Sequence, residues 1–288
     1  MTIAIYGSRR QNDAVEYVAK FLNVLAERGD KVMMHRKLYV HLLEYIPEEL
    51  KTVTSVVDGC EFTADLAVSL GGDGTFLRTA AWVGEKEIPI VGVNTGHLGY
   101  LAALTVNQLP ELPKLIADDY LRIERRSVLE ILSPDLPQHV GRYALNDIAV
   151  SKEETSSMIQ ASVSLGPTPL AEYKADGLVI CTPTGSTAYN LSVGGPIVQP
   201  TLDVNVISPV AAHSLSMRPL VVGADTPITI VPQARTAHIR LALDGRSTLV
   251  DTGTPVVVGQ APFKVLVMQV AEHTFAATLR QKLHWGEK

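Results

Sequence analysis

A glycine-rich turn between a strand-like run and a helix-like run is the feature that most constrains the fold of this chain. Residues 67–80 read AVSLGGDGTFLRTA. The residues before the glycines suit a buried strand, and Phe76, Leu77 and Ala80 have the spacing of one helix face. Glycines let backbone N–H groups approach a ligand, and Thr75 is placed to cap a helix whose free N–H groups attract anions. This order of strand, glycine loop and helix favours phosphate binding.

Asp73 is the residue of this loop that most narrows the chemistry. A carboxylate repels the phosphate that the backbone attracts, so its presence needs a reason. Asp73 could hold Mg²⁺ against phosphate oxygens, or it could take a proton from a hydroxyl that attacks phosphorus. An isolated Asp-Gly pair is more often a turn. Because this pair follows a strand and opens a helix, we interpret it as part of a site for phosphoryl transfer.

Composition narrows the class of protein. The chain has 288 residues, a formal net charge of -5 and two cysteines, Cys60 and Cys181. This length allows two domains, and a net-acidic surface argues against broad binding to nucleic acid or acidic membranes. Two distant cysteines make neither a disulfide framework nor a paired metal site. The N-terminal run lacks the basic lead and apolar length of a signal peptide, so we expect a cytoplasmic protein without a membrane span.

The first part of the chain alternates strand-like and helix-like runs. Residues 2–6 and 31–35 suit strands, and a helical pattern between them starts at Asp13, with Glu16 completing a capping box. This β-α-β order predicts a parallel sheet. A further strand, residues 88–93, is followed by a second glycine loop that carries His97 and Tyr100. In a doubly wound sheet the two glycine loops would form one crevice, where His97 could act as a base, bind phosphate or serve only a structural role.

Residues 106–120 suggest a helical connector interrupted by Pro110 and Pro113, and beyond it the pattern changes to short strands separated by Gly, Pro, Asn or Asp. The strand-like runs are residues 122–132, 143–150, 159–165, 178–182, 204–207, 228–231, 238–243, 255–258 and 263–270. Helical spacing returns at residues 273–283. We therefore expect an N-terminal α/β domain with a Rossmann-like parallel sheet, residues 1–104, against which a C-terminal helix, residues 272–288, packs back. Residues 105–271 are expected to form an all-β, sandwich-like domain.

Polar residues interrupt the apolar runs of this β-rich part at three places. Asn146 and Asp147 lie in ALNDIAV, where neighbouring side chains face opposite ways, so at least one must face the interior or a cleft. Residues 174–192 end in the hydroxyl-rich turn TPTGSTAY, whose hydroxyls suit ribose or phosphate and whose Tyr189 suits the face of a base. The same hydroxyls could merely cap a helix. Asp244 and Gly245 alone would be interpreted as a hairpin turn.

Other catalytic signatures are missing from the sequence. It contains no G-x-S-x-G, no H-E-x-x-H, no cysteine pair at ligand spacing, no glycine loop with a Lys-Ser/Thr tail and no G-x-G-x-x-G after a strand. Serine hydrolases, zinc enzymes and P-loop proteins are therefore disfavoured.

Taken in order, four blocks of the sequence resemble the NAD kinase family. They are GGDGTFLRTA at residues 71–80, NTGHLGYLA at 94–102, ALNDIAVSK at 144–152 and KADGLVICTPTGSTAYNLSVGGPI at 174–197. The first block is shared with lipid kinases, whereas the last discriminates the family. The resemblance implies phosphorylation of the 2′-hydroxyl of the adenosine ribose of NAD to give NADP, with ATP, another nucleoside triphosphate or polyphosphate as donor. It also implies Mg²⁺ or another divalent cation, and a homodimer or homotetramer.

The same resemblance assigns roles to individual residues. Asp73 would be the general base, and Gly72, Gly74 and Thr75 would shape the phosphate loop. The implied substrate- and nucleotide-binding residues are Tyr100, Asn146, Asp147, Lys174, Asp176, Thr184, Thr187, Ala188, Tyr189, Ser192 and Asp244. The family commonly has Asn-Glu where this chain has Asn146-Asp147, so the shorter carboxylate would reach a ribose hydroxyl either directly or through water. A lipid kinase and a dinucleotide-binding regulator are the alternative interpretations, and NAD and NADH are both open as acceptor.

Overall fold

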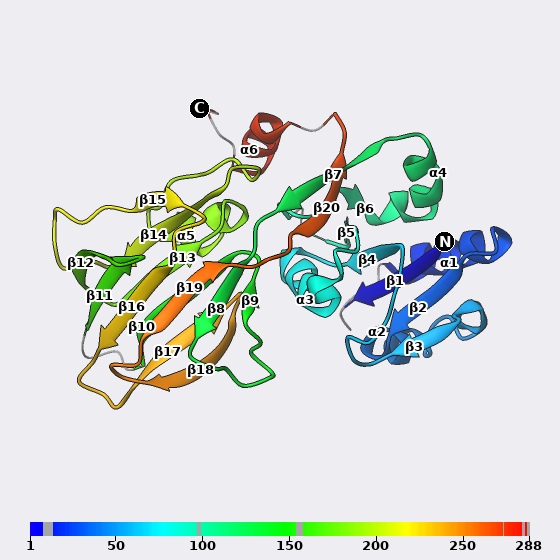
Figure 1. Cartoon of the computed structure of the whole chain (residues 1–288). Helices are drawn as coiled ribbons and strands as arrows, with labels where there is room; N and C mark the ends of the chain where they lie inside the picture. The colour runs from blue at the N-terminus through cyan, green and yellow to red at the C-terminus, as the bar shows by residue number, and fades with distance from the viewer. Residues whose placement is uncertain (8–13, 97–98, 154–157, 273, 284–285, 287–288) are drawn as a thin grey trace. The chain divides into compact units, whose positions relative to one another are not determined.

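The chain folds into two compact units. The computed structural model describes residues 1–7, 14–96, 99–153, 158–272, 274–283 and 286. One unit, here the α/β unit, comprises Met1–Arg125 and Val265–Lys288, and the other, here the β unit, comprises Arg126–Lys264 (Figure 1). Among the described residues, every helix is too short or too polar to cross a membrane.

The α/β unit is built on an eight-stranded sheet, in the order β3-β2-β1-β4-β5-β20-β7 with β6 beside β5. Its strands are β1 (Thr2–Gly7), β2 (Lys31–His35), β3 (Ser55–Val57), β4 (Leu66–Leu70), β5 (Ile90–Asn94), β6 (Leu104–Thr105), β7 (Leu121–Arg126) and β20 (Val265–Val270). The pairings from β1 to β6, and of β20 with β5, are parallel. Every residue of β4 and β5 is buried, as expected for parallel strands covered on both faces.

Helices of this unit follow the apolar spacing of the sequence. They are α1 (Val15–Glu27), α2 (Arg36–Leu42), α3 (Asp73–Val83), α4 (Leu112–Ala117) and α6 (Phe275–Leu283), with 3₁₀ turns η2 (Glu49–Thr52), η3 (Gly84–Lys86) and η4 (Val106–Glu111). α1 buries Val18, Phe21, Leu22 and Leu25, one face of a helix. The capping residue expected for α1, Asp13, lies outside the described residues.

The strand order places the glycine loop at the point of the sheet where ligands gather. β2 and β4 flank β1 on opposite sides, so successive connections leave β1 in opposite directions. Ligands of such sheets bind at the carboxyl ends of the strands beside this reversal. Gly7, the last residue of β1, lies level with Leu70, the last residue of β4. The residues that follow Leu70 therefore enter that edge of the sheet.

The β unit consists of two six-stranded sheets whose pairings are antiparallel. One sheet has the order β15-β14-β13-β10-β17-β18, and the other β12-β11-β16-β19-β8-β9. The strands are β8 (Leu129–Ser133), β9 (Tyr143–Ala144), β10 (Asp147–Lys152), β11 (Ile159–Leu165), β12 (Thr168–Ala175), β13 (Gly177–Cys181), β14 (Val204–Val210), β15 (Leu220–Gly223), β16 (Ile228–Gln233), β17 (His238–Leu243), β18 (Arg246–Asp251) and β19 (Val256–Gln260). Aliphatic residues of both sheets, such as Ile148 and Ile230, share one core. The predicted fold class, an α/β sheet plus a β sandwich, is confirmed.

Three local predictions were wrong. Residues 122–132 form two strands, β7 and β8, which belong to different sheets. Residues 263–270 were expected in the sandwich, but β20 joins the α/β sheet beside β5. Thr75 does not cap α3, because the helix begins two residues earlier, after the extended Gly72. Strand propensity identifies a strand without identifying its partner, which explains the first two errors.

Candidate active site

The predicted site residues fall into two groups, one in each unit. In the α/β unit, the glycine loop connects β4 to α3. The N–H group of Gly71 donates to the carbonyl of Val93 at 2.9 Å, and the carbonyl of Gly72 accepts from Thr75 and Phe76 at the start of the helix. Gly72 has a φ of -83°, and no neighbouring atom lies within 4 Å of where its Cβ would be. Neither backbone strain nor packing requires glycine there, so the bare backbone leaves room for a ligand.

Asp73 joins the two glycine loops of the α/β unit. Its Oδ2 accepts the backbone N–H of Tyr100 at 2.8 Å, and its Oδ1 accepts that of Leu101 at 3.0 Å. A Cβ on Gly99 would lie 2.0 Å from Asp73 Oδ1, so this contact requires glycine at position 99. The expected neighbourhood of the two loops is therefore present. Each oxygen of a carboxylate has two lone pairs, so the partly exposed Asp73 can still accept a hydrogen bond from a hydroxyl.

Tyr100 lies close to the Asp73 carboxylate, whereas Thr75 is hydrogen-bonded to Arg78 of its own helix. Burial, assisted by the charge of Asp73, raises the pKa of the Tyr100 phenol, whose buried Oη has no hydrogen-bond partner among the described residues. Lys282 of α6 places Nζ 5.2 Å from the centre of the Tyr100 ring. Thr75 is buried and accepts a hydrogen bond from Arg78 at 3.2 Å. His97 lies outside the described residues.

In the β unit, Asp244 organises the chain around Asn146. Asp244 and Gly245 form the two-residue turn between β17 and β18, with φ values of 47° and 80°. The hairpin interpretation was correct but incomplete. The Asp244 carboxylate accepts three backbone N–H groups, from Leu145 at 2.8 Å, Asn146 at 2.8 Å and Asp147 at 3.1 Å. With its side chain 5% exposed, Asp244 positions the Asn146-Asp147 pair.

Asn146 and Asp147 present acceptors that the described residues leave unsatisfied. Asp147 is 9% exposed, and its carboxylate receives no hydrogen bond from the described part of the chain. Burial, with a contribution from the charge of Asp244, raises the pKa of Asp147 to about 7. The buried Oδ1 of Asn146 likewise has no partner there. Unpaired buried acceptors are costly, so both groups fit a ligand that brings hydroxyl or N–H donors.

The hydroxyl-rich turn is hydrogen-bonded directly to Asn146. The N–H of Thr182 donates to the carbonyl of Asn146 at 2.9 Å, and Thr182 Oγ1 donates to that of Leu145 at 2.6 Å. A Cβ on Gly185 would lie 2.1 Å from the carbonyl oxygen of Asn146, so only glycine allows this approach. Ser186 Oγ donates to the Pro183 carbonyl at 2.7 Å. Several hydroxyls of the turn thus hold the turn itself together.

The exposure of the predicted residues increases along this turn, from Thr184 to Tyr189. Thr184 is buried and accepts from Arg126 at 3.3 Å, whereas Thr187 and Ala188 are partly exposed and Tyr189 is exposed. Ser192 is exposed and donates to the carbonyl of Tyr189 at 2.8 Å. Tyr189 thus offers a ring face to a ligand.

Lys174 and Asp176 lie at the connection between β12 and β13. Lys174 is exposed on β12. Asp176 forms an ion pair with Lys152 at 2.7 Å, in which the two side chains are 34% and 23% exposed. Sequence reasoning did not single out Lys152, Arg126 or Lys282. Lys152 ends the ALNDIAVSK block without a role of its own, and the other two lie outside the quoted blocks. Only the tertiary structure brings these cations to predicted site residues.

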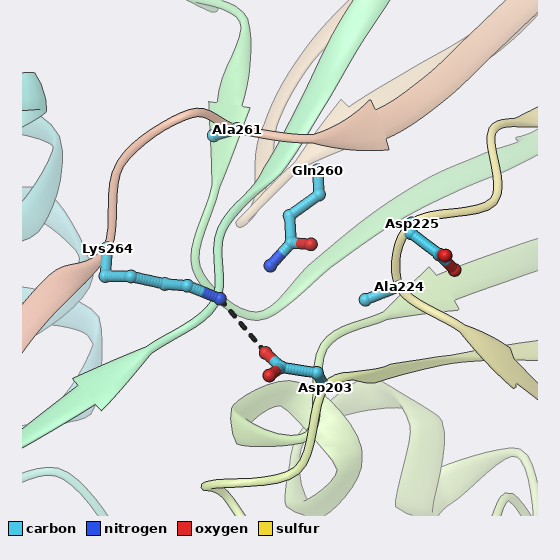
Figure 2. Close-up of a pocket in the computed structure, with 6 residues that line it drawn as sticks. All are labelled: Asp203, Ala224, Asp225, Gln260, Ala261 and Lys264. Carbon is cyan, nitrogen blue, oxygen red and sulfur yellow. Dashed lines mark hydrogen bonds and ion pairs between the residues drawn. The ribbon is translucent and has the colours of Figure 1, made fainter.

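A surface pocket of about 550 Å³ lies elsewhere in the β unit (Figure 2). Its lining residues are Asp203, Ala224, Asp225, Gln260, Ala261 and Lys264. Figure 2 shows Lys264 reaching Asp203, an ion pair of 3.1 Å. None of the predicted site residues lines this pocket, so it is not part of the candidate site.

The contact between Gly99 and Asp73 predicts a position-specific cost in stability. Gly99→Ala should lower the free energy of unfolding by roughly 1–3 kcal/mol, the usual cost of forcing atoms into a packed contact. Gly96→Ala is the matched control in the same loop, because no atom lies within 4 Å of its Cβ position. Urea denaturation measures both. Equal losses in the two variants would show that the contact between position 99 and Asp73 does not require glycine.

The raised pKa of Asp147 predicts how stability depends on pH. The unfolded carboxyl ionises near pH 3.8, whereas the folded one ionises only near pH 7. The proton on the Asp147 carboxyl therefore stabilises the folded state fully below the unfolded pKa of 3.8, and this stabilisation is lost as the pH rises through the folded pKa near 7. Relative to Asp147→Asn, the wild type should lose roughly 2–3 kcal/mol between pH 5 and pH 8. Parallel urea-midpoint curves for the two proteins would contradict this.

Comparison with known proteins identifies the family. Residues 3–120 match the ATP-NAD kinase N-terminal domain, and residues 145–270 match the ATP-NAD kinase C-terminal domain. An NAD kinase of Porphyromonas gingivalis is 40% identical over 284 residues, which cover 99% of this chain and 98% of that protein. An NAD kinase of Bacteroides fragilis is 38% identical over 286 residues, with 99% and 98% covered.

Solved structures share the fold. Yeast NADH kinase complexed with NADH superposes with a TM-score of 0.86 at 22% identity, covering 100% of this chain and 89% of that one. An NAD kinase from Archaeoglobus fulgidus in complex with ATP gives a TM-score of 0.73 at 23% identity, covering 99% and 98%. The two domain matches and the bacterial relatives show the family. The chain belongs to the ATP-NAD kinase family of phosphotransferases.

Proposed function

We propose that this protein transfers the terminal phosphoryl group of ATP to the 2′-hydroxyl of the adenosine ribose of NAD, giving NADP. The observation that carries the proposal is a carboxylate, Asp73, held by two backbone amides at the start of the helix after a glycine loop. Relatives named NAD kinase match this chain over nearly its whole length. A solved NAD kinase of the same fold was crystallised with ATP.

Asp73 acts as the general base in this proposal. The N–H groups of Tyr100 and Leu101 fix the orientation of its carboxylate. A ribose hydroxyl is a weak nucleophile, so an oriented carboxylate that accepts its proton lowers the barrier to attack on phosphorus. Gly72 and Gly74 leave the backbone of the first turn of α3 open to phosphate oxygens.

The β-unit group binds the dinucleotide in this proposal. The unsatisfied acceptors of Asn146 and Asp147 suit ribose hydroxyls, and the exposed ring of Tyr189 suits a base. Asp244 holds the Asn146-Asp147 pair through its three backbone contacts. The remaining binding residues that we propose are Tyr100, Lys174, Asp176, Thr184, Thr187, Ala188 and Ser192.

Mg²⁺ fits the site as an ion carried by the phosphate donor. The described residues contain no group of three or more His, Cys, Asp or Glu side chains that could hold a metal ion. Mg²⁺ is often bound mainly by substrate phosphates and water, so a dedicated protein cage is not required. The ion would neutralise charge on the donor phosphates. Another divalent cation of similar size would serve the same purpose.

Replacing the proposed base tests this function. Asp73→Asn should lower kcat for NADP formation by roughly 10²- to 10⁴-fold, the usual contribution of a general base, with a smaller change in KM for NAD. The assay couples NADP formed from NAD, ATP and Mg²⁺ to an NADP-specific dehydrogenase. Asp118→Asn is the matched control, because Asp118 is an exposed residue at the end of α4.

Each outcome of this assay is informative. A wild-type kcat in Asp73→Asn would remove Asp73 from the mechanism. A wild-type protein that binds NAD in calorimetry but forms no NADP with ATP or polyphosphate would instead be a dinucleotide-binding regulator. Thermal unfolding of both variants separates a loss of catalysis from a loss of folded protein.

A further inference from the structure

The C-terminal helix α6 brings a cation to the loop that holds Asp73. Lys282 lies on this helix, and its Nζ is 5.2 Å from the centre of the Tyr100 ring. No described residue forms an ion pair within 4.0 Å of this ammonium or a hydrogen bond to it. The aromatic ring is thus its nearest identified partner, and a ring face attracts a cation electrostatically.

The lysine and the carboxylate also interact through space. Burial lowers the pKa of the Lys282 ammonium, and the charge of Asp73 opposes that shift. The same Asp73 accepts the backbone N–H of Tyr100, whose ring lies under the lysine. Lys282, Tyr100 and Asp73 therefore form a continuous series of contacts from α6 to the first turn of α3.

Arg78 is another cation near this turn, and it is already engaged. It lies on α3 itself, donates to Thr75 Oγ1 at 3.2 Å, and its charge acts on the Tyr6 phenol. From the loop after β5, Asp73 is faced by the Tyr100 phenol and by the two backbone amides. Among the described residues, Lys282 is thus the cation that another element of the fold contributes to Asp73.

We propose that Lys282 is a positioning residue for phosphoryl transfer, which holds the Tyr100 loop against Asp73 and so keeps the carboxylate oriented. This inference rests on the proposed function, because it concerns the same reaction. Lys282 acts through Tyr100 and Asp73 and does not itself touch the reacting atoms. The C-terminal helix is then part of the catalytic apparatus, although no motif in its sequence indicates this.

Removal and restoration of the charge test the proposal. Lys282→Met keeps most of the side-chain length without the ammonium, and it should lower kcat by roughly 10-fold, about the rate equivalent of one cation–ring contact. KM for NAD should change less than kcat, because the ammonium does not touch the substrate in this proposal. Lys282→Arg should restore most of the lost kcat, because arginine is charged and also stacks on aromatic rings.

Arg280→Met provides the matched control. Arg280 is an exposed cation on the same helix, so its loss changes the helix charge without touching the ring. It should leave kcat and KM for NAD at their wild-type values.

The result that would overturn the inference is a Lys282→Met variant that matches Arg280→Met in kcat. Loss of activity that Lys282→Arg does not rescue, or that comes with an equal or larger rise in KM for NAD, would show a structural or substrate-binding role and would also overturn it. If Lys282→Met does not fold, Lys282→Gln carries the same comparison. An inactive wild type would refute the proposed function itself, so the two failures are distinguishable.

Discussion

The carboxylate of Asp73, shared between two backbone amides, is the contact on which the α/β part of the site depends. It joins the glycine loop after β4 to the loop after β5, and glycine at position 99 is what allows the approach. A carboxylate fixed in this way costs little further ordering when a hydroxyl arrives. The parallel pairing of β4 with β5 supports this contact, because it brings the ends of both strands to one edge of the sheet.

The β unit uses the same physical device at its own group of residues. Asp244 accepts three consecutive backbone N–H groups and so fixes the segment that carries Asn146 and Asp147. The turn around Gly185 then packs onto the carbonyl of Asn146. In both units a carboxylate orders a loop through backbone amides, and in the β unit Asn146 and Asp147 keep acceptors that have no partner among the described residues. Asp147, with its raised pKa, is the clearest of these.

Sequence reasoning predicted much of this arrangement. The strand, glycine loop and helix around Asp73 were identified because local propensity and tertiary structure agree there. The sandwich followed from strand spacing, and Asn146-Asp147 stood out as polar residues in an apolar run. The partner of β20 could not be predicted, nor could the backbone N–H groups that Asp73 and Asp244 accept, because each depends on pairing between distant segments. Lys152 and Lys282 were not singled out for the same reason, since the ion pair of Lys152 with Asp176 and the contact of Lys282 with Tyr100 form only in the tertiary structure.

The most direct test of the central claim is the position of the transferred phosphate, followed by ³¹P nuclear magnetic resonance during turnover of NAD and ATP with Mg²⁺. The γ-phosphate signal of ATP should decline at the rate at which a 2′-phosphomonoester signal of NADP appears. An NAD analogue without the adenosine 2′-hydroxyl should give no such signal. Phosphate on another hydroxyl, or release of inorganic phosphate alone, would contradict the account of Asp73 as the base for the 2′-hydroxyl.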